Sequence, residues 1–383
     1  MANRMIWNQT AFFGAGAVGE IPRQLVERHF TKALVVSDQG LVEAGVTAKV
    51  TELLDGAGFP FELFTDVAPN PPIENVKAGL TAFEAAQADV LIAVGGGSPL
   101  DTCKGIGIIA NNPEYADVLS LEGTPGTKHP SVPIIAVPTT AGTASETTIN
   151  YVLTDKSKQR KFVCVDPHDI PVLAIVDAEM MADAPRSLRV ATGLDALTHA
   201  IEGYITKGAW ELSDMFHLKA IQLIAQALPL AVDGDAKASD DMALAQYVAG
   251  MGYSNVGLGI VHSMAHALGG YYDAPHGVAN GLLLAPVMAF NAPASGDKYR
   301  DIGAAFGVAG ALTRPLAEVG ADTVKAVADM IAALGNPTML RQIGAQEADI
   351  PALALMALGD VCTPGNPRPV TAGDIESIYR SVL

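Results

Sequence analysis

The sequence of 383 residues predicts two domains of different class, an α/β domain over residues 1–184 and an all-helical domain over residues 185–383. Chains of this length usually divide into two domains. In the first half, short β-branched segments alternate with segments of helical period, which predicts a parallel sheet covered by helices on both faces. After about Pro185 the β-branched segments stop, and Ala-, Leu- and Met-rich segments of helical period follow one another.

In the first domain, near-continuous apolar segments predict buried strands, and the amphipathic segments between them predict helices. The strands are expected at Ala33–Ser37, Phe61–Thr65, Val90–Val94, Val132–Val137 and Val172–Val176. The helices are expected at Leu41–Ala57, Ile73–Ala88 and Leu100–Ala110, and a hinge is expected at Asp177–Pro185.

In the second domain, the periodicity predicts a succession of helices without strands. They are expected at Arg189–Ile205, Leu212–Leu228, Asp241–Met251, Asn255–Leu268, Gly277–Asn291 and Asp322–Leu334.

Composition excludes several classes of partner. The chain has 24 Lys and Arg against 41 Asp and Glu, a net charge of −17, so it repels nucleic acids and anionic membranes. No run of about 18 apolar residues predicts a membrane span. The three cysteines, Cys103, Cys164 and Cys362, are too few and too widely spaced for a disulfide framework, which favours a reducing, cytoplasmic location.

Two glycine-rich segments have the composition of phosphate-binding loops. Gly14 to Gly19 has the formal pattern GxGxxG, but a weakly apolar segment precedes it and Pro22 interrupts the helix expected after it. An edge hairpin with glycine turns is the favoured interpretation there. The segment Gly95-Gly96-Gly97-Ser98-Pro99 instead follows a buried strand directly and leads into a helix.

The Gly95 segment has the features that a Rossmann-like phosphate site needs. Glycines let backbone N–H groups approach a pyrophosphate, Ser98 suits the N-cap, and Pro99 suits the first helical turn. A second loop, Pro138 to Thr143, follows the next strand. Two such loops at the carboxyl ends of successive strands predict a dinucleotide site, with two ordinary tight turns as the alternative.

Asp38 ends the first predicted strand, where a carboxylate can accept hydrogen bonds from an adenosine ribose. It would repel a 2′-phosphate, which favours NAD over NADP. A solvated turn aspartate is the alternative.

The helical half carries a group of metal-binding side chains. Asp195 and His199 lie four residues apart on one predicted helix, His262 and His266 repeat that spacing on another, and His276 follows in a Gly- and Pro-rich turn. Imidazoles with one carboxylate suit Fe(II), Zn(II), Co(II) or Mn(II). Spacing alone leaves open which four of the five are ligands.

The surroundings of these histidines indicate the substrate class. No Lys or Arg occurs between Lys237 and Lys298, the stretch that contains His262, His266 and His276. A multiply charged anion would find no cationic partner from this stretch, so we expect a small neutral alcohol or aldehyde as the substrate.

The chain resembles the iron-containing (group III) alcohol dehydrogenases over essentially its whole length. The resemblance rests on the segments GGGSPLD from Gly95, PTTAGTASE from Pro138, GLDALTHAIE from Gly193 and HSMAHALGGYYDAPHG from His262. It implies the fold shared by these enzymes and dehydroquinate synthase, with an NAD-binding α/β domain, a helical domain, an Fe(II) between them, and a homodimer.

Carried over residue by residue, the resemblance implies the ligands Asp195, His199, His262 and His276, with His266 beside the reacting centre. It also assigns the pyrophosphate to the loop Gly95, Gly96 and Gly97. The implied cofactor contacts are Asp38, Asn70, Gly97, Ser98, Asp101, Thr139, Thr140, Thr143, Asn150 and Lys161. Cys362 is expected either near the site or as a buried inert thiol.

The resemblance implies NAD-dependent reduction of a short 2-hydroxyaldehyde, with lactaldehyde giving 1,2-propanediol and glycolaldehyde giving ethylene glycol. The metal, Fe(2+) or Zn(2+) as a substitute, is expected to act as a Lewis acid. His266 is expected to relay a proton, and Asn150 to orient the substrate or the nicotinamide. Another alcohol is the first alternative: 1,3-propanediol, ethanol or a longer primary alcohol. A dehydroquinate-synthase-like lyase and a non-catalytic binding protein are weaker ones.

Overall fold

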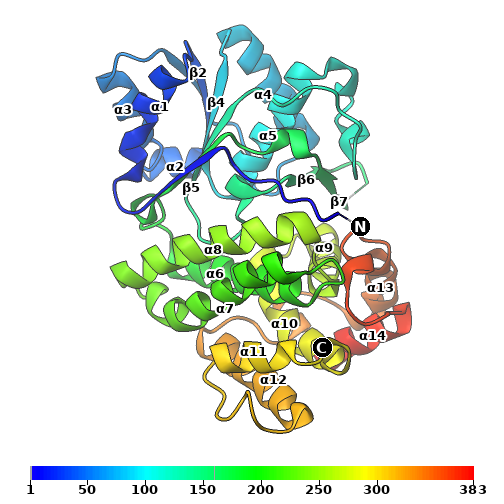
Figure 1. Cartoon of the computed structure of the whole chain (residues 1–383). Helices are drawn as coiled ribbons and strands as arrows, with labels where there is room; N and C mark the ends of the chain where they lie inside the picture. The colour runs from blue at the N-terminus through cyan, green and yellow to red at the C-terminus, as the bar shows by residue number, and fades with distance from the viewer. Residues whose placement is uncertain (1, 159) are drawn as a thin grey trace. The chain divides into compact units, whose positions relative to one another are not determined.

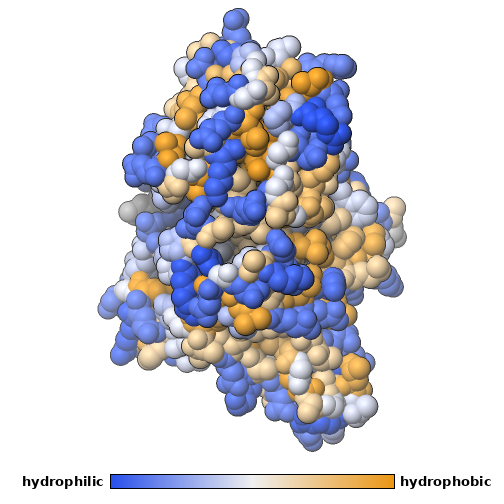
Figure 2. Space-filling model, turned by 90° about the vertical axis from the view of Figure 1, so that its left-hand side faces the viewer, coloured by the Kyte–Doolittle hydropathy of each residue, from blue (hydrophilic) through white to orange (hydrophobic). Residues whose placement is uncertain are grey.

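A computed structural model describes residues 2–158 and 160–383, and the chain forms two compact units, Met1–Ala184 and Pro185–Leu383 (Figure 1). On the face that Figure 2 shows, hydrophilic and hydrophobic residues are interspersed, and the exposed large apolar side chains are scattered along the sequence.

The first unit is built on a six-stranded parallel sheet, which confirms the predicted α/β class. The strand order is β1-β8-β5-β4-β2-β3. These strands are β1 (Thr10–Phe13), β2 (Ala33–Val36), β3 (Phe61–Phe64), β4 (Val90–Gly95), β5 (Ile134–Pro138) and β8 (Leu173–Val176).

Helices cover both faces of this sheet because successive residues of a strand point to opposite sides. On one face, Leu91 and Ala93 of β4 belong to the core that holds α4 (Ile73–Ala86) and α5 (Gly97–Asn111). On the other face, Ile92 belongs to the core that holds α1 (Ile21–Glu27) and α3 (Ala48–Gly56). The carboxyl ends of the central strands therefore remain at one edge, where their loops can bind a ligand.

An antiparallel hairpin that the sequence analysis did not predict follows β5. Its strands are β6 (Asn150–Asp155) and β7 (Arg160–Val165), and Asn150 pairs with Val165. The residues of β6 alternate between half-buried and buried, so the hairpin packs one face on the unit. The short helices of this unit are η1 (Ala17–Glu20), α2 (Gln39–Glu43), η2 (Pro113–Tyr115), η3 (Val118–Leu121), η4 (Ser145–Thr147), η5 (Pro167–Asp169) and η6 (Ala178–Met180).

Two local predictions in this unit were wrong. The single helix expected at Leu41–Ala57 is divided into α2 and α3, because Gly45 adopts a φ of 75° that ends the first helix. The edge hairpin expected before Gly14 is instead a parallel edge strand, β1, paired with β8. Pro22 does not interrupt the following helix either, because it lies in the first turn of α1, where proline is tolerated.

The second unit is helical throughout its described residues, as predicted. Its helices are α6 (Arg186–Ile205), α7 (Glu211–Ala231), α8 (Ala236–Val256), α9 (Ile260–Tyr272), α10 (His276–Ser295), α11 (Lys298–Ala305), α12 (Leu316–Ala333), α13 (Ile350–Leu358) and α14 (Ala372–Ser381). Short turns of 3₁₀ helix are η7 (Leu340–Ile343), η8 (Glu347–Asp349) and η9 (Thr363–Gly365).

Helix α6 is the central helix of this unit, since it packs against α7, α8 and α10 and is buried from Gly193 to Ile205. One helix predicted from the sequence, Asn255–Leu268, was wrong. Helix α8 ends at Val256, Gly257 adopts a φ of 84°, and α9 begins at Ile260.

Among the described helices, α10 alone is long and apolar enough by length and composition to cross a membrane, and half of its apolar window is buried inside the structure. A core helix of a soluble protein meets the same criterion.

Candidate functional site

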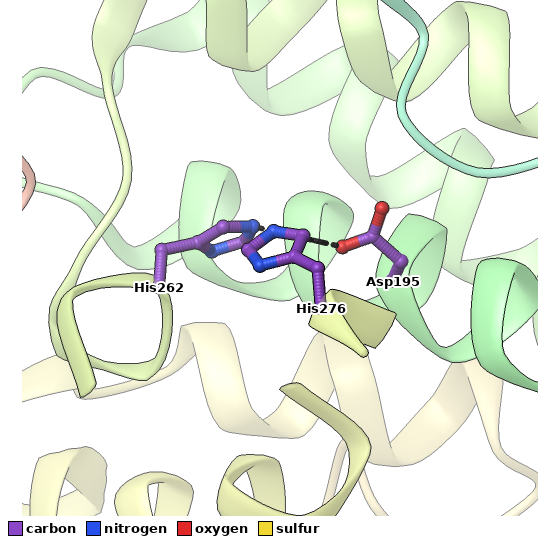
Figure 3. Close-up of side chains that lie close together, drawn as sticks. All are labelled: Asp195, His262 and His276. Atoms are coloured by element: carbon purple, nitrogen blue, oxygen red, sulfur yellow. Dashed lines mark ion pairs between the residues drawn. The ribbon is translucent and has the colours of Figure 1, made fainter. Parts of the chain in front are cut away.

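Three of the predicted metal ligands converge in the helical unit. Asp195 comes from α6, His262 from α9 and His276 from the first residue of α10, and their ligand atoms all lie within 4.8 Å of one another. Oδ1 of Asp195 is 3.5 Å from Nε2 of His276 and 3.9 Å from Nε2 of His262. Figure 3 shows both rings turned toward the carboxylate. The Gly- and Pro-rich sequence predicts His276 in a turn, whereas the structure places it at the start of a helix.

His199, the fourth predicted ligand, lies beside this group. It follows Asp195 by one helical turn, and its Nδ1 is 3.9 Å from Oδ2 of Asp195. Its ring centroid is 4.4 Å from that of His262 and is stacked 4.2 Å from the ring of Tyr253. The two i, i+4 residues thus present their side chains on the same face of α6.

Asn280 is a member of the site that the sequence analysis missed. It lies one turn after His276 on α10, and its Nδ2 donates to Oδ1 of Asp195 at 2.7 Å. The same nitrogen is 3.3 Å from Nε2 of His262 and 3.2 Å from Nε2 of His276. Oδ1 of Asp195 and the Nε2 atoms of His262 and His276 are therefore all aimed at one point, as the ligands of a cation are.

Glu202 is the second member that was missed. Its Oε2 lies 2.7 Å from Nδ1 of His262, and the backbone N–H groups of Val261 and His262 also donate to this carboxylate, at 2.7 Å and 3.2 Å. Burial raises the pKa of Glu202 to about 7, against the effect of these hydrogen bonds. The position of Glu202 on the face of α6 that carries Asp195 and His199 was the available signal.

The imidazole of His262 is neutral. Burial holds its pKa well below the usual range, and the neighbouring His266 lowers it further. With Nδ1 facing Glu202, the Nε2 lone pair faces Asp195, which is the tautomer that binds a metal.

His266 lies outside this group but stacks on it, with its ring centroid 5.3 Å from that of His276. Its Nδ1 is 2.9 Å from Oδ2 of Asp360, a residue that the sequence analysis did not single out. Burial alone would raise the pKa of Asp360, but His266 and the hydrogen bonds from the Cys362 amide and the Ser263 hydroxyl lower it to about 2. Asp360 is thus ionised and fixes the orientation of the His266 ring.

The donor set fits a transition-metal ion. The carboxylate of Asp195 and the imidazole of His262 are buried, the imidazole of His276 is 27% exposed, and the imidazole of His199 adjoins them. Among the described residues, the ion pairs of Asp195 are all with these histidines. Nitrogen and oxygen donors of this kind suit Fe(II) or Zn(II).

In the α/β unit, the predicted phosphate loop connects β4 to α5. Gly96 is the N-cap and α5 begins at Gly97, so Ser98 is the second helical residue and not the N-cap that the sequence predicted. Gly95 packs tightly, because a Cβ there would lie 2.3 Å from Cγ of Pro99. The free N–H groups of a helix start favour an anion at this position.

The threonine loop lies against this glycine loop. The amide of Thr139 donates to the carbonyl of Gly95 at 3.0 Å, and a Cβ on Gly96 would lie 3.3 Å from Oγ1 of Thr140. A Cβ on Gly97 would lie 3.2 Å from Cγ2 of Thr143. The two loops predicted to bind phosphates are thus brought together at one sheet edge.

Asp101 and Asn150 lie behind these loops. Oδ1 of Asp101 accepts from the Ser145 hydroxyl at 2.6 Å, and Oδ2 accepts from the amide of Val152 at 2.9 Å. Burial raises the pKa of Asp101 to about 6, although Lys104 opposes the shift. Lys104 also donates to the backbone carbonyl of Asn150 at 2.7 Å. Asp101 therefore supports the loop from inside the protein.

The remaining predicted cofactor residues lie at the ends of other elements. Asp38 is the N-cap of α2, and its Oδ1 accepts from the amide of Leu41 at 2.9 Å. Lys161 on β7 donates to Oδ1 of Asn70 at 2.8 Å, although these two residues are far apart in the sequence.

In the Gly14 segment, by contrast, the amide of Val18 donates to Oδ2 of Asp177 at 3.1 Å. The protein's own carboxylate thus satisfies that amide.

Comparison with known proteins identifies the family. Residues 8–178 match the profile "Iron-containing alcohol dehydrogenase", and residues 189–383 match "Fe-containing alcohol dehydrogenase family, C-terminal". The chain is 58% identical over 381 residues, covering 100% of both chains, to lactaldehyde reductase of Escherichia coli strain K12.

Solved structures share the fold. A crystal structure of 1,3-propanediol oxidoreductase superposes with a TM-score of 0.96 at 38% identity, covering 100% of both chains. Sulfoacetaldehyde reductase from Bifidobacterium kashiwanohense, in complex with NAD⁺, superposes with a TM-score of 0.87 at 26% identity, covering 100% of this chain and 99% of that one. The two profiles and the full-length relative establish that the chain belongs to the iron-containing alcohol dehydrogenase family.

Proposed function

We propose that this enzyme reduces lactaldehyde to 1,2-propanediol, and glycolaldehyde to ethylene glycol, with NADH and a bound Fe²⁺. The observation that carries the chemistry is the convergence of Asp195, His262 and His276 on one point. The 58% identity to lactaldehyde reductase over the whole chain supports the substrate. The overall reaction is lactaldehyde + NADH + H⁺ → 1,2-propanediol + NAD⁺.

Asp195, His199, His262 and His276 are the residues proposed to hold the metal. When bound there, Fe²⁺ would supply a Lewis acid for the aldehyde oxygen, and Zn²⁺ is the proposed substitute. Glu202 keeps the Nδ1–H of His262 turned away from the ligand side, and this preserves the Nε2 lone pair. Asp195 supplies the negative charge of the donor set.

His266 is the proposed proton carrier. Asp360 accepts a hydrogen bond from Nδ1 of His266 and stabilises the imidazolium form of the ring, which can donate the proton on Nε2 to the oxygen of the reduced substrate. The ring is largely buried, so it exchanges protons from a fixed position. Asn150 is proposed to orient the substrate or the nicotinamide amide. Its carbonyl is fixed by Lys104, and nothing among the described residues hydrogen-bonds its Oδ1.

The α/β unit is proposed to bind NAD along the edge formed by the two loops. Gly95, Gly96, Gly97 and Ser98 would hold the pyrophosphate, with Thr139, Thr140 and Thr143 beside it and Asp101 as a support. Asp38 would face the ribose and exclude a 2′-phosphate, and Asn70 with Lys161 would complete the site. The NAD⁺ complex of a relative with the same fold supports this placement.

The first alternative is a related short alcohol. The 1,3-propanediol oxidoreductase structure shares the fold at 38% identity, well below the 58% of the lactaldehyde enzyme. A dehydroquinate-synthase-like lyase is disfavoured, because the histidine stretch has no Lys or Arg for a phosphorylated acid.

A cytoplasmic location and a homodimer stay predictions. Light scattering at a known protein concentration checks the homodimer.

The test combines metal analysis with an NADH-oxidation assay on the Fe²⁺-loaded protein. We expect turnover of lactaldehyde and glycolaldehyde, with a lower kcat/KM for ethanal and longer aldehydes. We expect His262→Ala to lose the metal and at least about a hundredfold in kcat/KM. The matched control is His129→Ala, which removes an exposed imidazole and should change neither. If the metal-replete protein reduces neither hydroxyaldehyde, the proposed function is wrong.

A further inference from the structure

A second group of potential ligands lies in the helical unit. His266, Asp360 and Cys362 offer a nitrogen, an oxygen and a sulfur atom that all lie within 4.8 Å of one another. His266 comes from α9, while Asp360 and Cys362 come from the turn between α13 and η9. None of them belongs to the group of Asp195, His262 and His276.

Their spacing is close to that of a tetrahedral site. Bonds of about 2.0–2.3 Å from a zinc ion place two tetrahedral ligands roughly 3.3–3.7 Å apart. Nδ1 of His266 already lies 2.9 Å from Oδ2 of Asp360, and the thiol of Cys362 contacts the same carboxylate. The three atoms, all within 4.8 Å of one another, therefore lie close to the separations that one ion requires.

The charge at this point also favours a cation. Asp360 is ionised at neutral pH although its side chain is only 16% exposed, and the backbone amide of Cys362 and the hydroxyl of Ser263 hold its Oδ1 at 2.9 Å and 3.2 Å. Among the residues that the structure describes, Asp360 forms an ion pair with His266 and none with Lys or Arg. A largely buried carboxylate of this kind lacks a permanent positive partner.

We propose that His266, Asp360 and Cys362 form a second metal site, selective for thiophilic divalent ions such as Zn²⁺ and Cd²⁺. Binding is an exchange of ions without redox change: a metal–sulfur bond replaces the S–H bond of Cys362, and that proton leaves to solvent. The N–H proton of His266 moves from Nδ1 to Nε2, so that the Nδ1 lone pair reaches the metal. Asp360 binds as the carboxylate that it already is.

The sulfur atom distinguishes this site from the first one. A thiolate with one imidazole and one carboxylate favours Zn²⁺ and Cd²⁺ over Mg²⁺ and Ca²⁺, whereas the first group has only nitrogen and oxygen donors. Among the three cysteines, Cys103 and Cys164 are buried without exposure, and Cys362 is the partly accessible one.

Occupation of this site has a consequence that rests on the proposed function. An ion bound to Nδ1 of His266 replaces the N–H contact of the ring with Asp360. The ring then can no longer carry protons on both nitrogens, so it cannot act as the imidazolium acid that gives up a proton from Nε2. We therefore expect excess Zn²⁺ to inhibit the Fe²⁺-loaded enzyme through Cys362.

The binding test uses the metal-free full chain with Zn²⁺ alone, followed by gel filtration and metal analysis. The expected content is two Zn²⁺ per chain for the unchanged protein, one for Cys362→Ser, one for Asp195→Ala and none for the double variant. His129→Ala, which removes an exposed imidazole outside both groups of ligands, is the control and should retain two. One Zn²⁺ in the unchanged protein, or two in Cys362→Ser, overturns the second site.

A titration with Cd²⁺ tests the same site without a change at Cys362. In the Asp195→Ala background, the first equivalent of Cd²⁺ should produce the ultraviolet charge-transfer absorption of a cadmium–thiolate bond. No such band at one equivalent overturns the proposal.

The inhibition test separates this site from the proposed reaction. The Zn²⁺ concentration that halves the activity should be at least about tenfold higher for Fe²⁺-loaded Cys362→Ser than for the unchanged Fe²⁺-loaded enzyme. Equal inhibition of both proteins means that Zn²⁺ displaces Fe²⁺ from the first site, and overturns the inhibitory role. A chain that reduces no aldehyde but shows the Cys362-dependent cadmium band refutes the proposed function and leaves the second site standing.

Discussion

Glu202 accepts a hydrogen bond from Nδ1 of His262 at 2.7 Å, and it is itself held by the backbone amides of Val261 and His262. This relationship joins two helices, because Glu202 lies on α6 and His262 lies on α9. The carboxylate is buried, so it determines which nitrogen of the ring carries the proton. His262 therefore presents Nε2 to Asp195 before any metal arrives.

Glu202→Gln should weaken metal binding without removing a ligand. An amide accepts through one oxygen only, and its NH₂ group would face at least one of the three N–H donors around it. We expect the metal affinity to fall by about 10- to 100-fold. Competition with a chelator of known affinity measures this change.

The comparison variant for Glu202 is Glu211→Gln, which changes an exposed carboxylate at the first residue of α7. It should bind metal as the unchanged protein does. Equal metal affinity in Glu202→Gln and Glu211→Gln would show that this carboxylate does not orient His262.

Asp38→Asn should relax the preference for NADH over NADPH. Asparagine caps a helix about as well as aspartate, so the hydrogen bond to the amide of Leu41 is retained while the charge is lost. Without the charge, a 2′-phosphate is no longer repelled, and the kcat/KM ratio of NADPH to NADH should rise by about tenfold. Steady-state kinetics with both cofactors measures it. An unchanged ratio would mean that Asp38 only caps α2.

The sequence predicted the buried strands and helices of this fold better than the residues at which the helices end. A near-continuous apolar segment such as Val90–Val94 strongly indicates a central parallel strand. The structure has the strand β4 there. Periodicity continues across a glycine, however, so it could not indicate that Gly45 and Gly257 end helices through positive φ angles. The hairpin of β6 and β7 was missed because its polar and apolar residues alternate only weakly.

The residues of the candidate site were likewise predicted only in part. Helical spacing placed Asp195 with His199, and the resemblance selected His276, whose Nε2 does lie 3.5 Å from Asp195. Glu202 and Asn280 are common residue types whose importance depends on partners from other helices. Helical spacing does place Glu202 on the face of Asp195 and His199, but the hydrogen bonds of Glu202 and Asn280 arise only when α6, α9 and α10 pack together.

Gly277→Ala should damage the metal group through packing alone. Gly277 follows His276 at the start of α10, and a Cβ there would lie 2.1 Å from the backbone oxygen of Ala191 on α6. The helix start must move away from α6, which carries Asp195. We expect a loss of about 1–3 kcal/mol in stability and at least about tenfold weaker metal binding. Thermal melts and chelator competition measure the two effects.

Gly320→Ala is the matched control for this substitution. It lies inside α12, and nothing lies within 4 Å of the Cβ it would add. Alanine there should stabilise the protein by roughly 0.5–1 kcal/mol, because glycine disfavours a helix interior. If both variants melt and bind metal alike, the close approach of α10 to α6 does not position His276.

His217 is a buried histidine that the proposed reaction does not use. Its ring lies between α6 and α8, where a Cβ on Gly203 or on Gly252 would come within 2.3 Å of Nε2. Within the described part of the chain, neither ring nitrogen has a hydrogen-bond partner. Burial, together with the charge of Lys298, lowers the pKa of His217 to about 3.

This histidine should make the protein sensitive to acid. The unfolded chain binds a proton at His217 below a pH of about 6.5, while the folded chain binds it only below about 3, so the unfolded state holds more protons between these values. The free energy of unfolding should therefore fall by about 2 kcal/mol between pH 7.5 and pH 5. His217→Leu, which cannot bind a proton, should lose this part of the pH dependence, even if its packing lowers stability at pH 7.5. Denaturant unfolding of both metal-free proteins across this range measures the difference, and parallel pH profiles would show that His217 does not contribute.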